Sequence, residues 1–195
     1  ISLEFEAVQK VFESFFDDPS ERGGGVCVNV GGETVVDLWA GTVDLEGKEP
    51  WKHNTLVNSY CAIKPVTAIA ALMLVEAGKL ELDKPIAHYW PEFAQNGKER
   101  ITLRHMLSHQ SGLYDIRNLI ADASEMADWN HMLDVFAQAK PRFEAATGAA
   151  YQPLTFGWQV GGVLEKATGK SLSDLMQQYL VQPLQLDGAY FGVTA

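Results

Sequence analysis

Residues 58–68 read NSYCAIKPVTA and lead into a long apolar run. Proline has no backbone N–H and fits a helix only in its first turn, where that group would have no partner. Pro65 therefore predicts a helix that begins close to Cys61 and runs to Ala77. Side chains three positions apart share a helix face, so we expect the Cys61 thiol and the Lys64 ammonium to come within reach of each other.

A cysteine and a lysine at this spacing can act as a nucleophile and its base. The positive end of the helix dipole and a neighbouring cation both favour the thiolate, which is the reactive form of Cys61. A lysine that loses part of its hydration can accept a proton, and backbone N–H groups at the same helix end can hold an oxyanion. Taken alone, the two residues also fit a plainer interpretation, in which Cys61 is a small buried apolar side chain and Lys64 is a solvated cation.

The N-terminal part of the chain predicts a helix and a β-hairpin. From Leu3 to Phe16 the apolar residues recur every three or four positions, which is typical of one buried stripe on an amphipathic helix. Two β-rich runs, 26–30 and 34–39, flank Gly31-Gly32, a pair that accepts the positive φ of a tight turn. A lone two-stranded ribbon is marginally stable. We therefore expect the other strands of a larger sheet to come from sequence after Ala195 or from a second chain.

The remainder of the chain predicts mainly helices. They are expected at residues 85–89, 102–108, 124–138, 154–168 and 171–180, and Gly78 and Gly169 should end the helices that precede them. The fold class is α/β or α+β, with an all-helical lobe and the remaining sheet strands absent from this chain. This order assigns residues 1–57 to the N-terminal helix and hairpin of an α/β sheet domain, 58–180 to the Cys61 helix and an all-helical domain, and 181–195 to the start of a return to the sheet domain.

Composition and charge exclude several classes of protein. The 195 residues are 47% hydrophobic and 21% charged, which is typical of a globular protein and not of a disordered or fibrous one. The net charge of −10 repels polyanions, so we expect no nucleic-acid partner and no anionic membrane surface, whereas small neutral or cationic substrates fit. The longest apolar run, Ala68 to Val75, is much shorter than the about 20 residues of a membrane span.

The number and spacing of the cysteines indicate the cellular compartment of the protein. The chain has two cysteines, Cys27 and Cys61, which are too few for a disulfide framework and have no CxxC spacing. A cytoplasmic location is therefore expected. A leader removed before residue 1 would instead place the protein in the periplasm or outside the cell.

Three blocks of the sequence resemble a known superfamily. Residues 58–68 are similar to the S-x-x-K segment of serine β-lactamases and penicillin-binding proteins, with Cys61 in the place of the nucleophilic serine. The blocks LVEAGKLELDKP (74–85) and ITLRHMLSHQSGL (101–113) resemble the stretches that follow it in class C β-lactamases and the related esterases of the family VIII type. The agreement runs from about Val26 to Gly192. It implies a β-lactamase/transpeptidase-like fold, of which this chain resembles the N-terminal half.

The resemblance also implies a reaction. In class C enzymes and the related esterases a tyrosine replaces the serine of the second motif, and the matching residue is Tyr151 in FEAATGAAYQPLTFGW (143–158). A small ester would acylate Cys61 and water would then release the acid, with Lys64 as the proton acceptor and Tyr151 as the relay to the leaving group. Neither a cofactor nor a metal is implied. An amide or lactam, as in β-lactamases and D-aminopeptidases, is the alternative substrate.

Three departures from the family pattern bear on this function. A thiol needs less help from a base than a hydroxyl, but the larger sulfur of Cys61 can misalign the attack in a site shaped around oxygen. Tyr151 is followed by Gln152-Pro153 and so lacks the asparagine of the lactamase Y-x-N, whose amide contacts the β-lactam side chain; this favours a carboxylesterase. The K-T-G element is missing, because Lys166-Ala167-Thr168-Gly169 has an extra residue and falls at a helix end.

Two further functions stay open. The lost serine and the missing third motif fit a catalytically inactive homologue that serves as a binding or scaffold module. A papain-like thiol hydrolase would instead pair Cys61 with His105 or His109. These histidines, four positions apart, could also bind zinc, but Met106 stands where the zinc-protease motif has glutamate, which favours a structural histidine pair.

Overall fold

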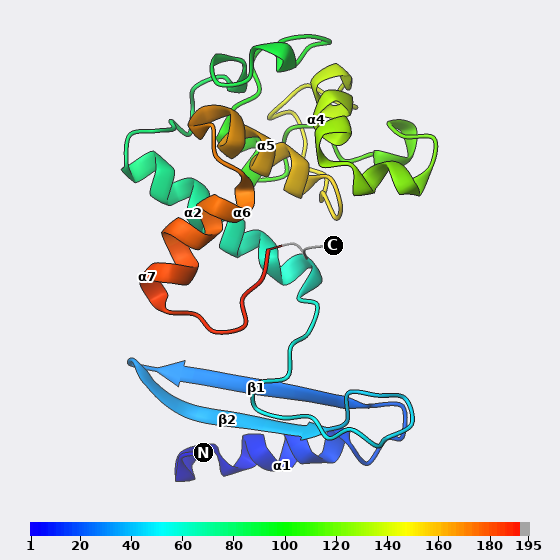
Figure 1. Ribbon diagram of the computed structural model, residues 1–195, viewed down its shortest axis with the longest axis vertical. Helices are drawn as coiled ribbons and strands as arrows, with labels where there is room; N and C mark the ends of the chain where they lie inside the picture. Colours follow the sequence, from blue (N-terminus) through cyan, green and yellow to red (C-terminus); the bar gives the residue numbers. More distant parts are fainter. Residues whose placement is uncertain (192–195) are drawn as a thin grey trace. The chain divides into compact units, whose positions relative to one another are not determined.

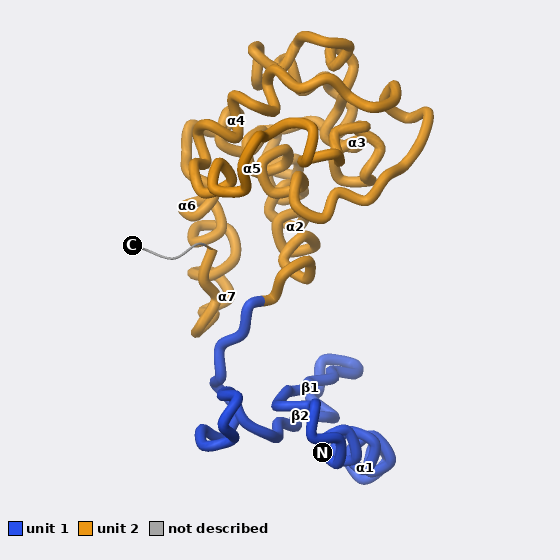
Figure 2. Tube along the Cα trace, turned by 90° about the vertical axis from the view of Figure 1, so that its right-hand side faces the viewer, with its two compact units in different colours: residues 1–58 blue, residues 59–195 orange. Residues whose placement is uncertain are grey.

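The structure is a computed structural model that describes residues 1–191. The chain divides into two compact units, residues 1–58 and residues 59–195 (Figure 2). Residues 192–195, which end the predicted return segment 181–195 and include Gly192, lie outside the described residues. No helix within the described part of the chain is both long and apolar enough to cross a membrane. The cytoplasmic location stays a prediction.

The first unit contains the predicted helix and hairpin. Helix α1 (Glu6–Phe15) follows one 3₁₀ turn (Leu3–Phe5), and strands β1 (Gly23–Val30) and β2 (Glu33–Gly41) pair antiparallel (Figure 1). The turn residues Gly31 and Gly32 have φ values of 61° and 88°, the positive φ that the sequence predicts for a two-residue loop. Within the described residues the sheet has these two strands.

The apolar stripe of α1 is not buried as the sequence predicts. No residue of α1 is buried, and Val11 and Phe15 are 57% and 56% exposed. The stripe and the start of β1 line an open cavity of about 430 Å³. Gly23, Gly24 and Gly25 lie on the strand side of this cavity, and a Cβ atom on Gly24 would meet nothing within 4 Å, so this part of the strand offers the stripe little apolar surface.

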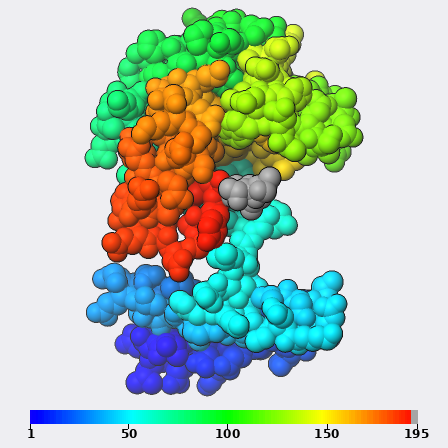
Figure 3. Space-filling model, in the orientation of Figure 1, coloured from blue at the N-terminus to red at the C-terminus, as the bar shows by residue number. Residues whose placement is uncertain are grey.

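The second unit is helical, as predicted. Its α-helices are α2 (Ile63–Glu76), α3 (Leu103–Leu107), α4 (Trp129–Gln138), α5 (Phe156–Thr168), α6 (Leu172–Met176) and α7 (Gln182–Leu184). One turn of π-helix (Gln177–Val181) joins α6 to α7, and 3₁₀ turns lie at Tyr60–Ala62, Ile86–His88, Pro91–Phe93, Ile116–Asn118 and Ala123–Ala127. The irregular segments between α2 and α4, green in Figure 3, cover one end of this unit.

Several helix boundaries differ from the predicted ones for local reasons. The predicted helix 124–138 is broken at Asp128, whose extended backbone makes it an N-cap and whose carboxylate accepts a hydrogen bond from His131 N at 3.0 Å. Residues 85–89 form only a 3₁₀ turn. Gly78 and Gly169 have φ values of 67° and 70° directly after their helices, as expected for C-terminal caps.

Helix α5 is at the centre of the helical core. It packs against α2, α3, α4 and α6. A Cβ atom on Gly162 would lie 2.7 Å from Leu133 of α4, so the missing side chain is what lets the two helices approach. The core also takes in large side chains from the turns between helices, among them Trp90, Phe93 and Ile86, all nearly inaccessible to water.

Candidate active site

The start of α2 carries the first two candidate residues. A 3₁₀ turn at Tyr60–Ala62 leads into α2 at Ile63, and Pro65 lies in the first helical turn, as predicted. Cys61 is an exposed free thiol. Tyr60, directly before it, has a φ of 44°, which is rare for a bulky residue and stores backbone strain of the kind that is common at functional sites.

The third candidate residue, Tyr151, lies on the segment between α4 and α5. The Lys64 Nζ atom donates a hydrogen bond to the carbonyl oxygen of Pro153 at 2.9 Å, which ties the start of α2 to this segment. The same Nζ atom lies 5.2 Å from the centre of the Tyr151 ring and 6.0 Å from that of Phe156. The lysine is thus held between two aromatic rings and one carbonyl.

One cavity joins the three candidates. It measures about 300 Å³ and is lined by Cys61, Lys64, Pro65, Ala68, Leu107, His109, Tyr151 and Phe156. All of these residues belong to the helical unit. The structure therefore brings together the three side chains that the sequence singles out, although Tyr151 is separated from Cys61 by most of the helical unit's sequence.

The neighbours of Cys61 favour its ionised form. Hydrogen bonds from Tyr151 and then from Lys64 lower the pKa of the Cys61 thiol below its ordinary value, and the positive charge of Lys64 adds to this, while partial desolvation works in the opposite direction. A thiolate is the nucleophilic form of cysteine. The arrangement can therefore supply a nucleophile together with two groups that can move its proton.

The two candidate histidines are in different environments. His105 caps its own helix: its Nδ1 accepts a hydrogen bond from Thr102 N at 3.2 Å, and its ring lines another cavity. His109 instead lines the cavity of Cys61. The two histidines thus line different cavities, and the Nδ1 atom of each ring has its own hydrogen-bond partner, Thr102 N for His105 and Gln152 Oε1 for His109. Across the described residues no three histidine, cysteine or carboxylate side chains gather as a metal site.

A buried polar network behind Tyr151 was not predicted from the sequence. His109 Nδ1 lies 3.1 Å from Gln152 Oε1, and Gln152 Nε2 donates to Ser111 Oγ at 2.6 Å and to Gln159 Oε1 at 3.0 Å. The side chains of Gln152, Ser111 and Gln159 are inaccessible to water. His109 and Ser111 of this network lie in the block 101–113, where polar side chains among apolar ones were the signal that could have indicated the network.

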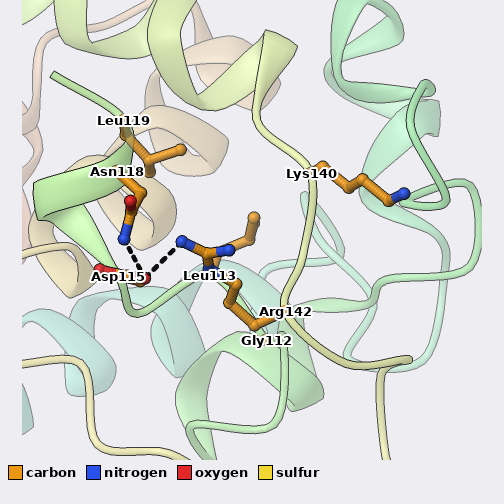
Figure 4. A pocket seen from close by; sticks show the side chains of 7 residues that line it. All are labelled: Gly112, Leu113, Asp115, Asn118, Leu119, Lys140 and Arg142. Carbon is orange, nitrogen blue, oxygen red and sulfur yellow. Dashed lines mark hydrogen bonds and ion pairs between the residues drawn. The ribbon is translucent and has the colours of Figure 1, made fainter.

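A third cavity in the helical unit has no candidate nucleophile. It measures about 330 Å³ and is lined by Gly112, Leu113, Asp115, Asn118, Leu119, Lys140 and Arg142 (Figure 4). The Asp115 carboxylate accepts hydrogen bonds from Asn118 Nδ2 and Arg142 Nη2, both at 2.6 Å. These contacts, that of Asn118 first, lower the pKa of Asp115. Asp115 and Arg142 form an ion pair with each other, and we interpret this cavity as a structural feature and not as a second candidate site.

Comparisons with known proteins show which proteins this chain is similar to. The model of the Beta-lactamase family matches residues 8–195. The Esterase/beta-lactamase LipL of Mycobacterium tuberculosis is 34% identical over 188 residues, which are 96% of this chain and 43% of the relative. The crystal structure of a family VIII carboxylesterase has a TM-score of 0.86 and 34% identity over 93% of this chain and 50% of its own.

A penicillin-binding protein homologue from Caulobacter crescentus gives a similar result. Its crystal structure has a TM-score of 0.87 and 33% identity over 94% of this chain and 49% of its own. This chain thus spans about half the length of the relatives that it matches.

Proposed function

Because this chain belongs to the Beta-lactamase family and has the β-lactamase/transpeptidase-like fold, we propose that it is part of a carboxylesterase that hydrolyses small esters through a covalent acyl-enzyme on Cys61. The observation that carries the proposal is that Cys61, Lys64 and Tyr151 line one cavity. The name of the relative LipL, Esterase/beta-lactamase, supports the same reaction class.

The reaction proceeds in two halves. The proton of Cys61 first passes to the Lys64 amine, which becomes the ammonium beside the thiolate, and the Sγ atom then attacks the ester carbonyl to form a C–S bond and a tetrahedral oxyanion. Collapse of the intermediate breaks the bond to the alcohol oxygen, which leaves with a proton relayed through the hydroxyl of Tyr151. Water then attacks the thioester in the same manner, releasing the acid and restoring the thiol.

The shape and chemistry of the cavity favour a small ester over a lactam. Pro65, Leu107 and Phe156 give it an apolar wall, which suits a short acyl chain. The asparagine of the lactamase Y-x-N is absent here. The amide of the neighbouring Gln152 cannot replace it, because this side chain is buried and bonded to His109, Ser111 and Gln159.

Initial rates of hydrolysis of p-nitrophenyl butyrate by the full-length protein test the proposed roles. We expect Lys64→Ala and Tyr151→Phe each to lower kcat by roughly 10²- to 10⁴-fold, since each removes a proton-transfer group. Cys61→Ala should abolish turnover, whereas Cys27→Ser, which changes the other free cysteine, should leave it unchanged. Wild-type rates in both Lys64→Ala and Tyr151→Phe would refute the assignment.

Mass spectrometry after incubation with an activated ester separates the alternatives. An acyl adduct on the Cys61 peptide and none on the Cys27 peptide supports the acyl-enzyme, and the absence of any adduct favours the inactive homologue. Faster acylation by a chromogenic cephalosporin than by the ester favours the lactamase alternative. Activity that survives Lys64→Ala but is lost in His109→Ala favours a papain-like pair.

A further inference from the structure

Three consecutive residues at the site are held by a single histidine. The backbone N–H of Ala150 donates to the carbonyl oxygen of His109 at 3.0 Å, the His109 ring packs edge to face against the ring of Tyr151 at 4.9 Å between centres, and its Nδ1 lies 3.1 Å from Gln152 Oε1. His109 also contacts Phe156, at 5.5 Å between ring centres. The backbone of His109 has a φ of 61°, a left-handed conformation that costs free energy in a residue other than glycine. Such a conformation persists only where the surrounding contacts hold it.

The hydrogen bonds of the buried network behind His109 can be donated in one direction only. At its inner end, the amide of Gln159 approaches the carbonyl oxygens of Leu113 at 2.8 Å and Thr155 at 3.3 Å. Carbonyl oxygens only accept, so the atom that faces them is the donor Nε2, and Oε1 of Gln159 must face the other way. There Oε1 accepts from Ser111 Oγ at 2.8 Å and from Gln152 at 3.0 Å.

This direction determines the protonation of His109. Because Gln152 donates to Gln159 through Nε2, its Oε1 is the atom that faces His109. An amide oxygen accepts, so His109 Nδ1 must carry a hydrogen. In the neutral ring the other nitrogen, Nε2, is then an acceptor, which is the opposite of the form that an unconstrained histidine side chain prefers. A flip of the Gln152 amide would place two amide oxygens 3.0 Å apart in a site without water contact.

We propose that His109 is a positioning residue for Tyr151, and that the buried side chains of Gln152, Ser111 and Gln159 fix the Nδ1–H tautomer of its neutral form. It acts through the segment 150–152, which it holds by its carbonyl, its ring and its Nδ1–H. Tyr151 itself is 54% exposed and needs this support to keep its hydroxyl at Cys61. The catalytic consequence rests on the proposed function, whereas the tautomer does not.

Nitrogen-15 NMR of the full-length protein with labelled histidine tests the tautomer without any assay of activity. The His109 signals are assigned by their loss in His109→Asn. Above the pH at which the ring is protonated, we expect the Nδ1–H pattern for His109, and a change toward the Nε2–H pattern in Gln152→Leu. Gln138→Leu, a matched change at an exposed glutamine of α4, should leave the pattern as in the wild type. An Nε2–H pattern for neutral His109 in the wild type overturns the proposal.

A pair of substitutions at position 109 tests the positioning role. The asparagine amide can take the place of the imidazole Nδ1–H, whereas the glutamine amide reaches only the place of Nε2. With p-nitrophenyl butyrate we expect kcat to fall about a hundredfold in His109→Gln and only about tenfold in His109→Asn, with KM little changed, since a displaced catalytic group costs turnover. Equal losses in the two variants, or a larger loss in His109→Asn, overturn the proposal.

The two measurements keep this proposal distinct from the proposed function. If the wild-type protein shows the Nδ1–H tautomer but does not hydrolyse the ester, the proposed esterase function is wrong and the proposed effect of Gln152, Ser111 and Gln159 on the tautomer is confirmed. If the protein hydrolyses the ester but shows the Nε2–H tautomer, the proposed function is supported and the proposed role of the buried hydrogen bonds at His109 is wrong.

Discussion

The two units of the chain bury their apolar side chains to very different extents. In the part of the chain that the structure describes, Val36 is the one buried hydrophobic residue contributed by residues 1–58, whereas the helical unit buries a continuous cluster that includes Trp90, Phe136 and Val160. The helix of the first unit has a clear apolar stripe and still leaves Val11 and Phe15 more than half exposed.

The contrast shows what a side-chain pattern can and cannot specify. An amphipathic helix buries its stripe only where a second apolar surface of matching width meets it. Helix α5 provides that surface for its neighbours, while a two-stranded hairpin that begins with three glycines does not provide it for α1. Cys61, Lys64 and Tyr151 all belong to the helical unit, so the site depends on the better packed of the two units.

Deleting one large apolar side chain from each unit should give the largest contrast. We expect Phe136→Ala to lower the free energy of unfolding of the helical unit by about 3–5 kcal/mol, because Phe136 is inaccessible to water and its removal leaves a cavity. Phe12→Ala, at a half-buried position on α1, should cost roughly 1 kcal/mol. Hydrogen exchange measured peptide by peptide reports on each unit separately, and equal losses would contradict the difference in packing.

Adding one methyl group to a glycine in each unit should have an intermediate effect. Gly112 has a φ of 75°, and a Cβ atom there would lie 2.6 Å from the carbonyl oxygen of Phe143, so Gly112→Ala should destabilise the helical unit by about 1–3 kcal/mol. A Cβ atom on Gly24 would meet nothing within 4 Å. We therefore expect Gly24→Ala to change stability by less than about 0.5 kcal/mol. A neutral Gly112→Ala in urea denaturation would mean that the 112–143 contact is looser than described.

The last contrast between the units concerns a buried lysine and the effect of pH. Lys98 is inaccessible to water, donates hydrogen bonds to the carbonyl oxygens of Gln95 and Ala139, and has a pKa that burial lowers to about 8, from 10.5 when solvated. Between these two values the unfolded chain binds more protons than the folded one, so the free energy of unfolding should rise with pH. Lys98→Met should remove this rise.

An exposed lysine of the first unit provides the control for this experiment. Lys10→Met on α1 should leave the rise between pH 8 and 10.5 as in the wild type. The measurement is urea denaturation at pH 7.5 and pH 10 for the three proteins. Parallel changes in the wild type and in Lys98→Met would contradict a depressed lysine pKa.

Local sequence signals predicted much of the fold. Pro65 predicted the start of α2 because a residue without an N–H fits only the first helical turn, and Gly31-Gly32 predicted the hairpin because both residues adopt positive φ. The family resemblance, and not the residue pattern, linked Tyr151 to Cys61. In the structure, Tyr151 and Cys61 line the same cavity.

The parts that the sequence did not predict depend on distant contacts. The stripe of α1 carries the same periodicity whether or not a partner surface exists, so its exposure could not be predicted from its own residues. Likewise, His109 and Gln152 are 43 positions apart, and only the fold brings the glutamine amide next to that imidazole. The roles of Cys61, Lys64 and Tyr151 stay predictions until they are tested by substitution.

The two free cysteines, one in each unit, allow the most direct test of an activated nucleophile. Alkylation by iodoacetamide, followed by mass spectrometry at a series of pH values, measures the reactivity of Cys61 with Cys27 as the internal reference. Because Tyr151 and Lys64 lower the pKa of Cys61, its alkylation should persist to lower pH than that of Cys27, and Tyr151→Phe should move the Cys61 curve to higher pH. Coincident curves for the two cysteines, unchanged by Tyr151→Phe, would contradict the central claim.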